Sequence, residues 1–384
     1  MSYNPRASTR SLYIHWPFCP YRCHFCPFVA LASHDQYMGR YHQALCKEIR
    51  AFGVQLDHKL ELDTIYMGGG TPSTYPDDLL LDMFGTIREI ANFNYNSEVT
   101  IEVNPGTVRA EQLQIWRSAG INRISMGVQS LKEKALHALN RMQNTQDIYR
   151  LLEQAQGIID NVSVDFILGL PGVSESEWKA YLSQVVTWPI KHISMYFLMV
   201  HENTPLYFKV QSKIVDLPKD DAVVDLYHWS CQLLQEHGFE QYEVSNFAKK
   251  GYQSRHNTVY WDRKPYKAFG LGACSFDGQW RFQNEKSLLP YLESIEQNRH
   301  VIAFSEELTE PQIRLEKIML GVRRAQGVEW DDLIQGLTSQ QIALIDQRVA
   351  VLAQRNLLSL EKGRLILTAS GLAIENEIVR QLSL

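Results

Sequence analysis

Short β-rich runs alternate with longer stretches of helical spacing over the first half of the chain. The β-rich runs cover residues 11–16, 63–67, 99–103, 123–128, 163–168 and 192–198, and the helical stretches cover 38–53, 79–91, 110–119, 146–156 and 175–187. Strands that alternate with helices at this spacing are typical of βαβ units and of a parallel sheet. Six such units predict an α/β fold in which the sheet curves into an open, partial (β/α)6 barrel.

The end of the chain has a different pattern. Helical stretches at 311–324, 330–336 and 339–355 are followed by alternating residues at 357–368, as in a β-hairpin, and by a helix at 370–382. Three helices and a hairpin predict a winged-helix-like module. Winged helices often bind DNA, but acidic residues are mixed with the few basic ones here, so we expect this module to serve packing.

These patterns divide the chain into three parts. We expect the barrel to cover residues 1–215 and a middle region, which starts with a helix near residue 220, to cover 216–304. The winged-helix-like module then covers 305–384. We find no internal repeat and no low-complexity linker, so the three parts are expected to form one compact body.

Candidate functional residues lie where the predicted strands end. Three cysteines follow the first strand, Gly68-Gly69-Gly70-Thr71-Pro72-Ser73 follows the second, Glu102 ends the third, Gln129 ends the fourth, and Asp165 with Gly169-Leu170-Pro171-Gly172 marks the fifth. In barrels of parallel strands, chemistry lies at the carboxyl ends of the strands, because the loops there converge on one mouth. Five separated segments therefore predict a single site at that mouth.

The composition is that of an ordinary globular protein: 384 residues, 45% hydrophobic and 21% charged, with a net charge of −5. The negative charge argues against a broad nucleic-acid surface. Residues 1–10 lack the apolar core of a signal peptide, and no run of about 18 apolar residues predicts a membrane span. We therefore expect a cytoplasmic protein with reduced thiols. Cys46, Cys231 and Cys274 stand alone and are predicted to be buried small hydrophobic residues.

Cys19, Cys23 and Cys26 form a C-x3-C-x2-C pattern. Thiolates suit both zinc and iron–sulfur clusters. A [4Fe–4S] cluster normally takes four cysteines, so three leave one iron open to an exchangeable chelating ligand. The alternative is a structural zinc completed by His15 or His24, although the usual zinc spacings place two or four residues between ligands. A disulfide is the weaker alternative, because a reducing compartment favours metal ligation.

Taken together, these motifs resemble a known family. The cysteine triplet, the glycine run at 68–73, Glu102-Val103-Asn104-Pro105, Gly127-Val128-Gln129-Ser130 and the segment 165–172 occur in order, and the resemblance runs nearly from end to end. The chain is similar to the radical S-adenosylmethionine proteins related to oxygen-independent coproporphyrinogen III dehydrogenase, and most similar to their HemW branch, the heme chaperones. The resemblance implies that S-adenosylmethionine chelates the open iron, and that an electron delivered to the cluster can cleave the sulfonium to a 5′-deoxyadenosyl radical.

Two groups of residues can hold the methionine part of S-adenosylmethionine. Gly69, Gly70 and Thr71 lack bulk and can present backbone groups to it, although a plain tight turn uses the same residue types. Arg141 can form a fork on the methionine carboxylate. Without the resemblance, Arg141 would be taken for a surface arginine.

Further candidates lie at strand ends or beside the cysteines. Glu102, Gln129 and Asp165 can exchange hydrogen bonds with the ribose hydroxyls or the amino group of the cofactor. Singly, each would be taken for a strand-end cap or a turn partner. Tyr13 and Phe25 match family positions that contact the cofactor, although by pattern alone both are core aromatic residues.

The first candidate function is heme binding and delivery. The stretch from His256 to Trp261 is similar to the HNxxYW sequence associated with heme in HemW proteins, and imidazole is a common heme ligand. A structural histidine beside the core is the alternative. Heme delivery implies a heme-acceptor protein and an electron donor as partners, with any peripheral membrane contact made through the acceptor. A monomer and a homodimer are both compatible with the sequence.

The second candidate is oxidative decarboxylation of coproporphyrinogen III. The dehydrogenase branch has a long N-terminal extension and a further cysteine two positions after the third, where this chain has Phe28, so we disfavour this activity. A third candidate is a methyltransferase or another enzyme that uses a second S-adenosylmethionine. Two departures from the HemW pattern leave this candidate open: Pro27 replaces an Asp, and Phe276 replaces a histidine in a Gly-x-Gly-Ala-Gly-Ala-His-type segment.

Overall fold

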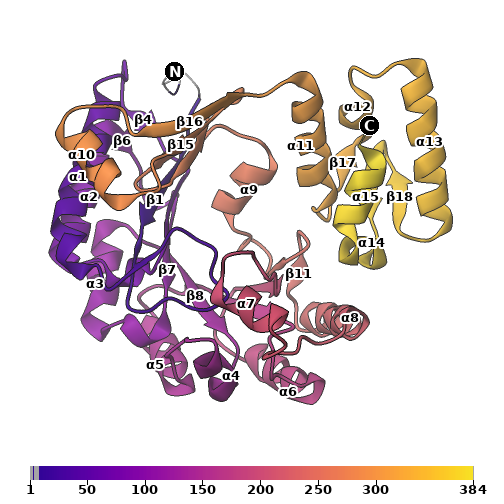
Figure 1. The fold of residues 1–384 in the computed structure, drawn as a ribbon, viewed down its shortest axis with the longest axis horizontal. Helices are drawn as coiled ribbons and strands as arrows, with labels where there is room; N and C mark the ends of the chain where they lie inside the picture. The colour runs from indigo at the N-terminus through magenta and orange to yellow at the C-terminus, as the bar shows by residue number, and fades with distance from the viewer. Residues whose placement is uncertain (1–2, 4–7, 384) are drawn as a thin grey trace.

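The computed structural model describes Tyr3 and residues 8–383. The expectation about a signal peptide concerns residues 1–10, most of which lie outside the described residues. In the part of the chain that is described, the central sheet has nine strands in the order β11-β12-β10-β9-β8-β7-β5-β1-β13. Figure 1 shows helices around the outer side of this sheet and the C-terminal elements as a separate lobe beside it.

The six predicted strands form the centre of the sheet and are all parallel. They are β1 (Ser11–Trp16), β5 (Thr64–Gly69), β7 (Glu98–Val103), β8 (Arg123–Gln129), β9 (Asn161–Leu168) and β10 (His192–Phe197). The helices between them are α1 (Met38–Gly53), α2 (Asp77–Ile90), α3 (Ala110–Ala119), α4 (Glu133–Ala138), α5 (Thr145–Ala155) and α6 (Glu175–Val185). This order confirms the predicted α/β class with an open, barrel-like parallel sheet.

The six parallel strands have one apolar and one polar face, because successive side chains of a strand point to opposite faces. The apolar set, such as Leu12, Ile65 and Ile101, is fully buried and packs with the helices in the main core. The polar set faces the interior, where Tyr13 stacks on Tyr66 of the next strand at 6.2 Å between ring centroids. A sheet that is polar on its inner face provides hydrogen-bonding groups for a ligand.

The middle region extends this sheet at both edges, which the sequence did not predict. β13 (Lys267–Phe269) pairs parallel with β1, whereas β12 (Asn246–Ala248) pairs antiparallel with β10 and with β11 (Glu240–Gln241). The region also contains α8 (Asp220–Glu236), α9 (Arg255–Trp261), α10 (Leu288–Glu296), β14 (Cys274–Phe276) and β15 (Trp280–Asn284). Its apolar side chains, including Phe269 and Tyr291, belong to the main core, so this region is part of the barrel body.

The C-terminal module has the predicted helices and hairpin. After β16 (Ile302–Glu307), its elements are α11 (Glu310–Val322), β17 (Val328–Glu329), α12 (Trp330–Ile334), α13 (Ser339–Gln354), β18 (Leu358–Glu361), β19 (Arg364–Leu367), α14 (Ala369–Ala373) and α15 (Glu375–Leu382). The strands pair in the order β17-β19-β18. The module has its own core, which includes Ile318, Ile345 and Leu365. The exact domain boundaries at 215 and 304 stay a prediction.

Short elements complete the chain. They are β2 (Phe18–Cys19), β3 (Leu31–Ala32), β4 (Leu60–Glu61), β6 (Ala91–Asn92), α7 (Pro205–Gln211) and the 3-10 turns Asp35–Tyr37, Pro72–Thr74 and Pro105–Thr107. β2 pairs parallel with β3, which ties the start and the end of the cysteine loop together. No helix in the described residues has both the length and the apolar character needed to cross a membrane.

One prediction about the single cysteines is wrong. Cys46 is buried as expected and Cys231 is half-buried, but Cys274 is exposed. Cys274 begins β14, where alternation along the strand turns the neighbouring Ser275 inward, so that its hydroxyl donates to the carbonyl of Ala268. The thiol of Cys274 therefore points to the opposite side, away from the core.

Candidate functional site

The cysteine loop runs from the end of β1 to β3 and is held by residues from other strands. Cys19 Sγ lies 3.0 Å from the hydroxyl of Thr71, which follows β5. Arg141, which follows α4, places Nη1 3.7 Å from Cys23 Sγ. Within the loop, the amide of Cys26 donates to the carbonyl of Cys23 at 3.2 Å. The structure therefore brings all three predicted ligands into one loop that is anchored at the carboxyl end of the sheet.

Burial makes two of these three thiols, Cys19 and Cys26, poor acids on their own. Cys23 is 8% exposed, and Cys19 and Cys26 are half-buried. Burial raises the pKa of Cys19 to about 11, partly offset by the Thr71 hydroxyl, and burial also raises the pKa of Cys26. A thiol ligates metal as the thiolate, and burial disfavours this charged form, so a bound cation must stabilise it. This loop is suited to a metal centre and not to a free nucleophilic thiolate.

The geometry does not support the zinc alternative. Zn–S bonds of about 2.3 Å in a tetrahedral site hold the sulfurs roughly 3.8 Å apart. In the described residues, the cysteine loop does not supply three ligand atoms within 4.8 Å of one another. His15 lies beside this loop, with its Nε2 2.9 Å from the Val29 carbonyl and its Nδ1 3.0 Å from the Tyr13 hydroxyl. A [4Fe–4S] cluster does not need the three sulfurs to meet at one ion, because each thiolate binds a different iron.

The glycine run lets two strand-end loops touch through their backbones. The amide of Gly70 donates to the carbonyl of Trp16 at 2.8 Å, and the amide of Thr71 donates to Phe18 at 2.9 Å. A Cβ on Gly70 would lie 2.4 Å from the carbonyl oxygen of Pro17, which no side chain tolerates. Gly70 is therefore required for contact between the loops. The amides of the run are already engaged, so a ligand would meet carbonyl oxygens or side chains here.

Glu102 is the central carboxyl group of the inner face. One of its oxygens accepts from the Tyr66 hydroxyl at 2.9 Å and the other accepts from the amide of Gly69 at 3.1 Å. Gly69 adopts a φ of +122°, which turns this amide toward the carboxyl group. Burial raises the pKa of Glu102 to about 7, although the Tyr66 hydroxyl lowers it. Glu102 can therefore change its protonation state near neutral pH when a charged ligand approaches.

Among the described residues, the buried side-chain oxygens without a hydrogen-bond partner include one on Asp165 and one on Asn104. Asp165 accepts from the Ser125 hydroxyl at 2.9 Å through Oδ2, but its buried Oδ1 has no hydrogen-bond partner. Asn104 donates to the Tyr21 hydroxyl at 2.5 Å, and its buried Oδ1 is likewise without a partner. Unsatisfied buried acceptors are costly unless a ligand or water supplies a donor. These two oxygens can therefore accept from hydroxyl or amino groups of a bound ligand.

Gln129 and Arg141 meet at the end of β8, where the strand bulges. The register shifts between Gly127 and Gln129, and Gln129 has a φ of +65°. A Cβ on Gly127 would lie 2.9 Å from Gln129 Nε2 and 3.0 Å from Arg141 Nη2, so glycine leaves room for both. Arg141 also donates to the carbonyl of Gly127 and, at 2.9 Å, to Gln143. The bulge re-aims Gln129 at the site, as bulges beside active sites often do.

The aromatic candidates differ in position. Tyr13 lies on the inner face, with its hydroxyl 3.0 Å from His15 and its ring stacked on Tyr66. Phe25 packs at the edge of a separate apolar cluster that contains Leu136 and Leu206. Tyr13 is therefore grouped with Glu102 and Asp165, whereas Phe25 supports the cysteine loop from its apolar side.

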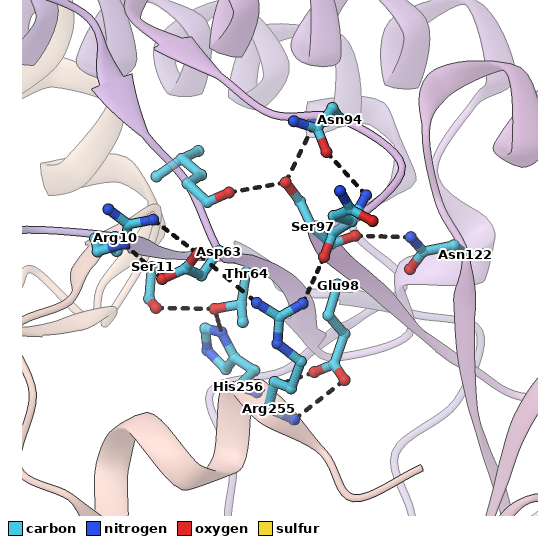
Figure 2. A network of polar contacts seen from close by, with 12 residues as sticks. Arg10, Ser11, Asp63, Thr64, Asn94, Ser97, Glu98, Asn122, Arg255 and His256 are labelled. Carbon is cyan, nitrogen blue, oxygen red and sulfur yellow. Dashed lines mark hydrogen bonds and ion pairs between the residues drawn. The ribbon is translucent and has the colours of Figure 1, made fainter. Parts of the chain in front are cut away.

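His256 lies beside Thr64, the first residue of β5, apart from the cysteine loop. It is fully buried in α9, its Nδ1 is 2.7 Å from the Thr64 hydroxyl, and its Nε2 is 2.8 Å from the Tyr260 hydroxyl. Figure 2 shows His256 beside Thr64 and Ser11, next to the ion pair of Asp63 with Arg10. The structure thus places His256 near the amino ends of the strands and not among the cysteines.

The tautomer of His256 follows from its neighbours. Thr64 donates its hydroxyl proton to Ser11 at 2.9 Å, so it accepts from Nδ1–H of His256. Nε2 then carries the lone pair and accepts from Tyr260. Burial lowers the pKa of His256 to about 3, which keeps the imidazole neutral. The ring also stacks on Tyr66 at 5.1 Å, and this connects it with Glu102.

Sequence reasoning missed several residues of the inner face. Tyr66 and Ser125 contact the predicted site residues Glu102 and Asp165, and Asn104 contacts Tyr21 in the cysteine loop. Tyr196 keeps 42% of its surface accessible, although desolvation by the surrounding protein raises its pKa. The signal was available in the sequence, because each strand alternates apolar and polar residues. The polar position of every strand could have been assigned to the interior.

Comparison with known proteins shows that the chain is similar to radical SAM proteins and to HemW heme chaperones. Residues 13–185 match the Radical SAM superfamily. The heme chaperone HemW of Synechocystis is 33% identical over 330 residues, which cover 84% of this chain and 79% of that protein. The heme chaperone HemW of Bacillus subtilis is 29% identical over 375 residues, covering 96% and 98%. HemW of Escherichia coli is 36% identical over 269 residues, covering 68% and 69%.

A solved structure also shares the fold. The coproporphyrinogen III oxidase HemN from Escherichia coli, described as a radical SAM enzyme, superposes with a TM-score of 0.84 at 23% identity, covering 99% of this chain and 92% of that one. This likeness supports the arrangement of the barrel together with the C-terminal module. At this identity it concerns the fold alone.

Proposed function

Because the chain belongs to the HemW family of radical SAM proteins, we propose that it binds heme and delivers it to an acceptor protein. We also propose that Cys19, Cys23 and Cys26 hold a [4Fe–4S] cluster to which S-adenosylmethionine binds. The observation that carries the proposal is the extent of the match, since HemW relatives cover the barrel, the middle region and the C-terminal module together.

The residues of the inner face suit the parts of S-adenosylmethionine. Oδ1 of Asp165 can accept from a ribose hydroxyl or an amino group, and Glu102 can ionise beside a cationic group. Arg141 has more N–H donors than its contacts with Gly127, Gln143 and Cys23 use, and it can direct one to the methionine carboxylate. When bound, the cluster and S-adenosylmethionine supply one-electron reductive cleavage of a sulfonium, and the protein supplies orientation.

We propose His256 as the heme ligand. The neutral ring and the lone pair on Nε2 are what a heme iron requires. The hydroxyl of Tyr260 lies at that lone pair, so ligation requires the Tyr260 side chain to turn away. The hydrogen bond from Nδ1–H to Thr64 can remain and would orient the ring, as a hydrogen bond to the second nitrogen of a metal-ligating histidine does.

The remaining features of the proposal concern partners and location. We propose a cytoplasmic protein that receives electrons from a donor protein, passes heme to an acceptor, and contacts membranes only through that acceptor. We do not propose coproporphyrinogen decarboxylation, because Phe28 stands where the dehydrogenase branch has a further cysteine. The side chain of Phe28 is 65% exposed, and it offers no ligand to the cysteine loop.

A heme titration after anaerobic cluster reconstitution tests the proposal, with 5′-deoxyadenosine measured in the same samples. We expect one heme per chain with little cleavage, and a heme affinity at least about tenfold weaker in His256→Ala, with a shifted Soret band. His237→Ala is the matched control, because His237 is exposed at the end of α8. Absence of heme binding would overturn the proposed function. Unchanged affinity and spectrum in His256→Ala would overturn only the ligand assignment.

A further inference from the structure

A second group of metal-ligating side chains lies on the outer helix layer, away from the cysteine loop. His42 and Cys46 are four residues apart on α1, so they point to the same side of that helix. Asp82 lies on α2, which packs against α1. These three side chains therefore converge between two neighbouring helices.

The ligand atoms are close enough for one ion. Nε2 of His42 lies 2.9 Å from Oδ2 of Asp82, and Sγ of Cys46 lies 3.9 Å from that oxygen and 3.8 Å from each ring nitrogen of His42. In a tetrahedral zinc site with ordinary bond lengths, such atoms are roughly 3.3–3.6 Å apart. Small side-chain adjustments would therefore form three bonds to one ion. Among the described residues this is the group whose ligand atoms lie within 4.8 Å of one another.

The contacts around His42 have the form of a supported metal ligand. Its Nδ1 lies 2.9 Å from the hydroxyl of Tyr75, which is 1% exposed and stacked on Trp16 at 3.7 Å. A hydroxyl can accept from Nδ1–H as well as donate to Nδ1, so a metal on Nε2 leaves this contact in place. Metal-ligating histidines are usually held in this way at their second nitrogen.

The site is open on one side only. The side chain of Asp82 is 59% exposed, whereas that of His42 is 6% exposed and Cys46 is 2% exposed. An ion could enter from solvent at Asp82 and keep a water as its fourth ligand. The nearby cation Arg50 is engaged by Glu89 and by the Thr86 hydroxyl, so it does not occupy the position.

We propose that His42, Cys46 and Asp82 form a binding site for a divalent cation of the zinc class, separate from the cysteine loop. A donor set of one nitrogen, one sulfur and one oxygen is borderline in softness, which suits zinc and excludes magnesium and calcium. His42, Tyr75 and Asp82 can satisfy one another by hydrogen bonds alone. These hydrogen bonds alone do not explain why the buried thiol of Cys46 lies beside the same two side chains.

Cobalt titration tests the proposal, because a cobalt–thiolate bond gives a charge-transfer absorption. The titration uses the full chain with Cys19→Ser, Cys23→Ser and Cys26→Ser, so that the cysteine loop does not compete. We expect one equivalent of cobalt with thiolate absorption, displaced by zinc. Tyr75→Phe should weaken binding by about 10–100-fold, and loss of the ligand in Cys46→Ser should weaken it further and abolish the absorption.

Two controls keep the result interpretable. Cys231→Ser removes a half-buried thiol from α8, outside the proposed ligand set, and should leave the titration unchanged. Circular dichroism and thermal unfolding establish that each variant is folded before its titration is compared. Absence of stoichiometric cobalt binding in the folded parent chain, or thiolate absorption that persists in Cys46→Ser, would overturn the proposal.

Discussion

Replacing Gly70 by alanine should separate the two loops that build the candidate site. The added Cβ would lie 2.4 Å from the carbonyl oxygen of Pro17 and 2.7 Å from that of Phe18. Both neighbours are backbone atoms, so no side-chain rotation relieves the contact. The loops must move apart by about 0.6 Å to reach even the 3.0 Å limit that real Cβ atoms respect.

That displacement would act on the hydrogen bonds that hold the glycine run against the cysteine loop. It stretches the hydrogen bonds from Gly70 to Trp16 and from Thr71 to Phe18, which are 2.8 and 2.9 Å long. Overpacking of this kind costs about 1–3 kcal/mol of unfolding free energy. Functional groups need to be held within roughly 0.5 Å of their working geometry, so the cysteine loop would also lose its alignment with Thr71.

The assay combines iron content after anaerobic reconstitution with equilibrium unfolding of the apoprotein. We expect Gly70→Ala to lose most of the bound iron and to be destabilised. Gly85→Ala is the matched control, since Gly85 is exposed within α2 and its Cβ would meet no atom within 4 Å. There the substitution should stabilise the protein by about 1 kcal/mol, because alanine is the better helix former. Wild-type iron content and stability in Gly70→Ala would refute the assembly argument.

Three further outcomes are expected. Cys23→Ser should abolish cluster absorbance after reconstitution; retained absorbance near 400 nm would contradict the ligand assignment. Arg323→Met should lower the free energy of urea unfolding by about 3 kcal/mol, because it removes the cation that pairs with the buried carboxyl group of Glu243. Arg380→Met, which breaks the exposed pair with Glu377, should lower it by less than about 1 kcal/mol. Equal losses in the two variants would contradict this prediction. The raised pKa of Glu102 means that this carboxyl group stays protonated in the folded protein between about pH 4.5 and 7, while it ionises in the unfolded chain, so folding stability falls as pH rises. From pH 5 to 7 the wild type should lose about 2 kcal/mol more unfolding free energy than Glu102→Gln. Parallel pH profiles of the two proteins would exclude the raised pKa.

The parallel strands were predictable because their signal is local. Each of the six strands combines a short apolar run with turn residues at its end, and the alternation that buries Ile14 also turns Tyr13 inward. Glu102 lies next to the end of β7 as predicted, whereas Asp165 lies inside β9, three residues before the strand ends. Their grouping in space then required only the rule that parallel strands end at one mouth.

Other features depend on contacts that no local pattern records. β13 is three residues long and is placed by its pairing with β1, more than 250 residues earlier in the chain. The positions of Cys274 and of His256 depend on how the middle region folds back over the barrel. Likewise, the pairing of Cys46 with Asp82 became visible only when α1 and α2 were packed together.

The location of His256 connects the two ligand proposals through one aromatic ring. Tyr66 stacks on His256 at 5.1 Å between ring centroids, and its hydroxyl donates to Glu102 at 2.9 Å. Freeing Nε2 of His256 for heme requires Tyr260 to turn away, while the bond from Nδ1 to Thr64 restrains the ring. Tyr66 is therefore the side chain that lies between the proposed heme ligand and Glu102, and its hydroxyl lowers the pKa of that carboxyl group.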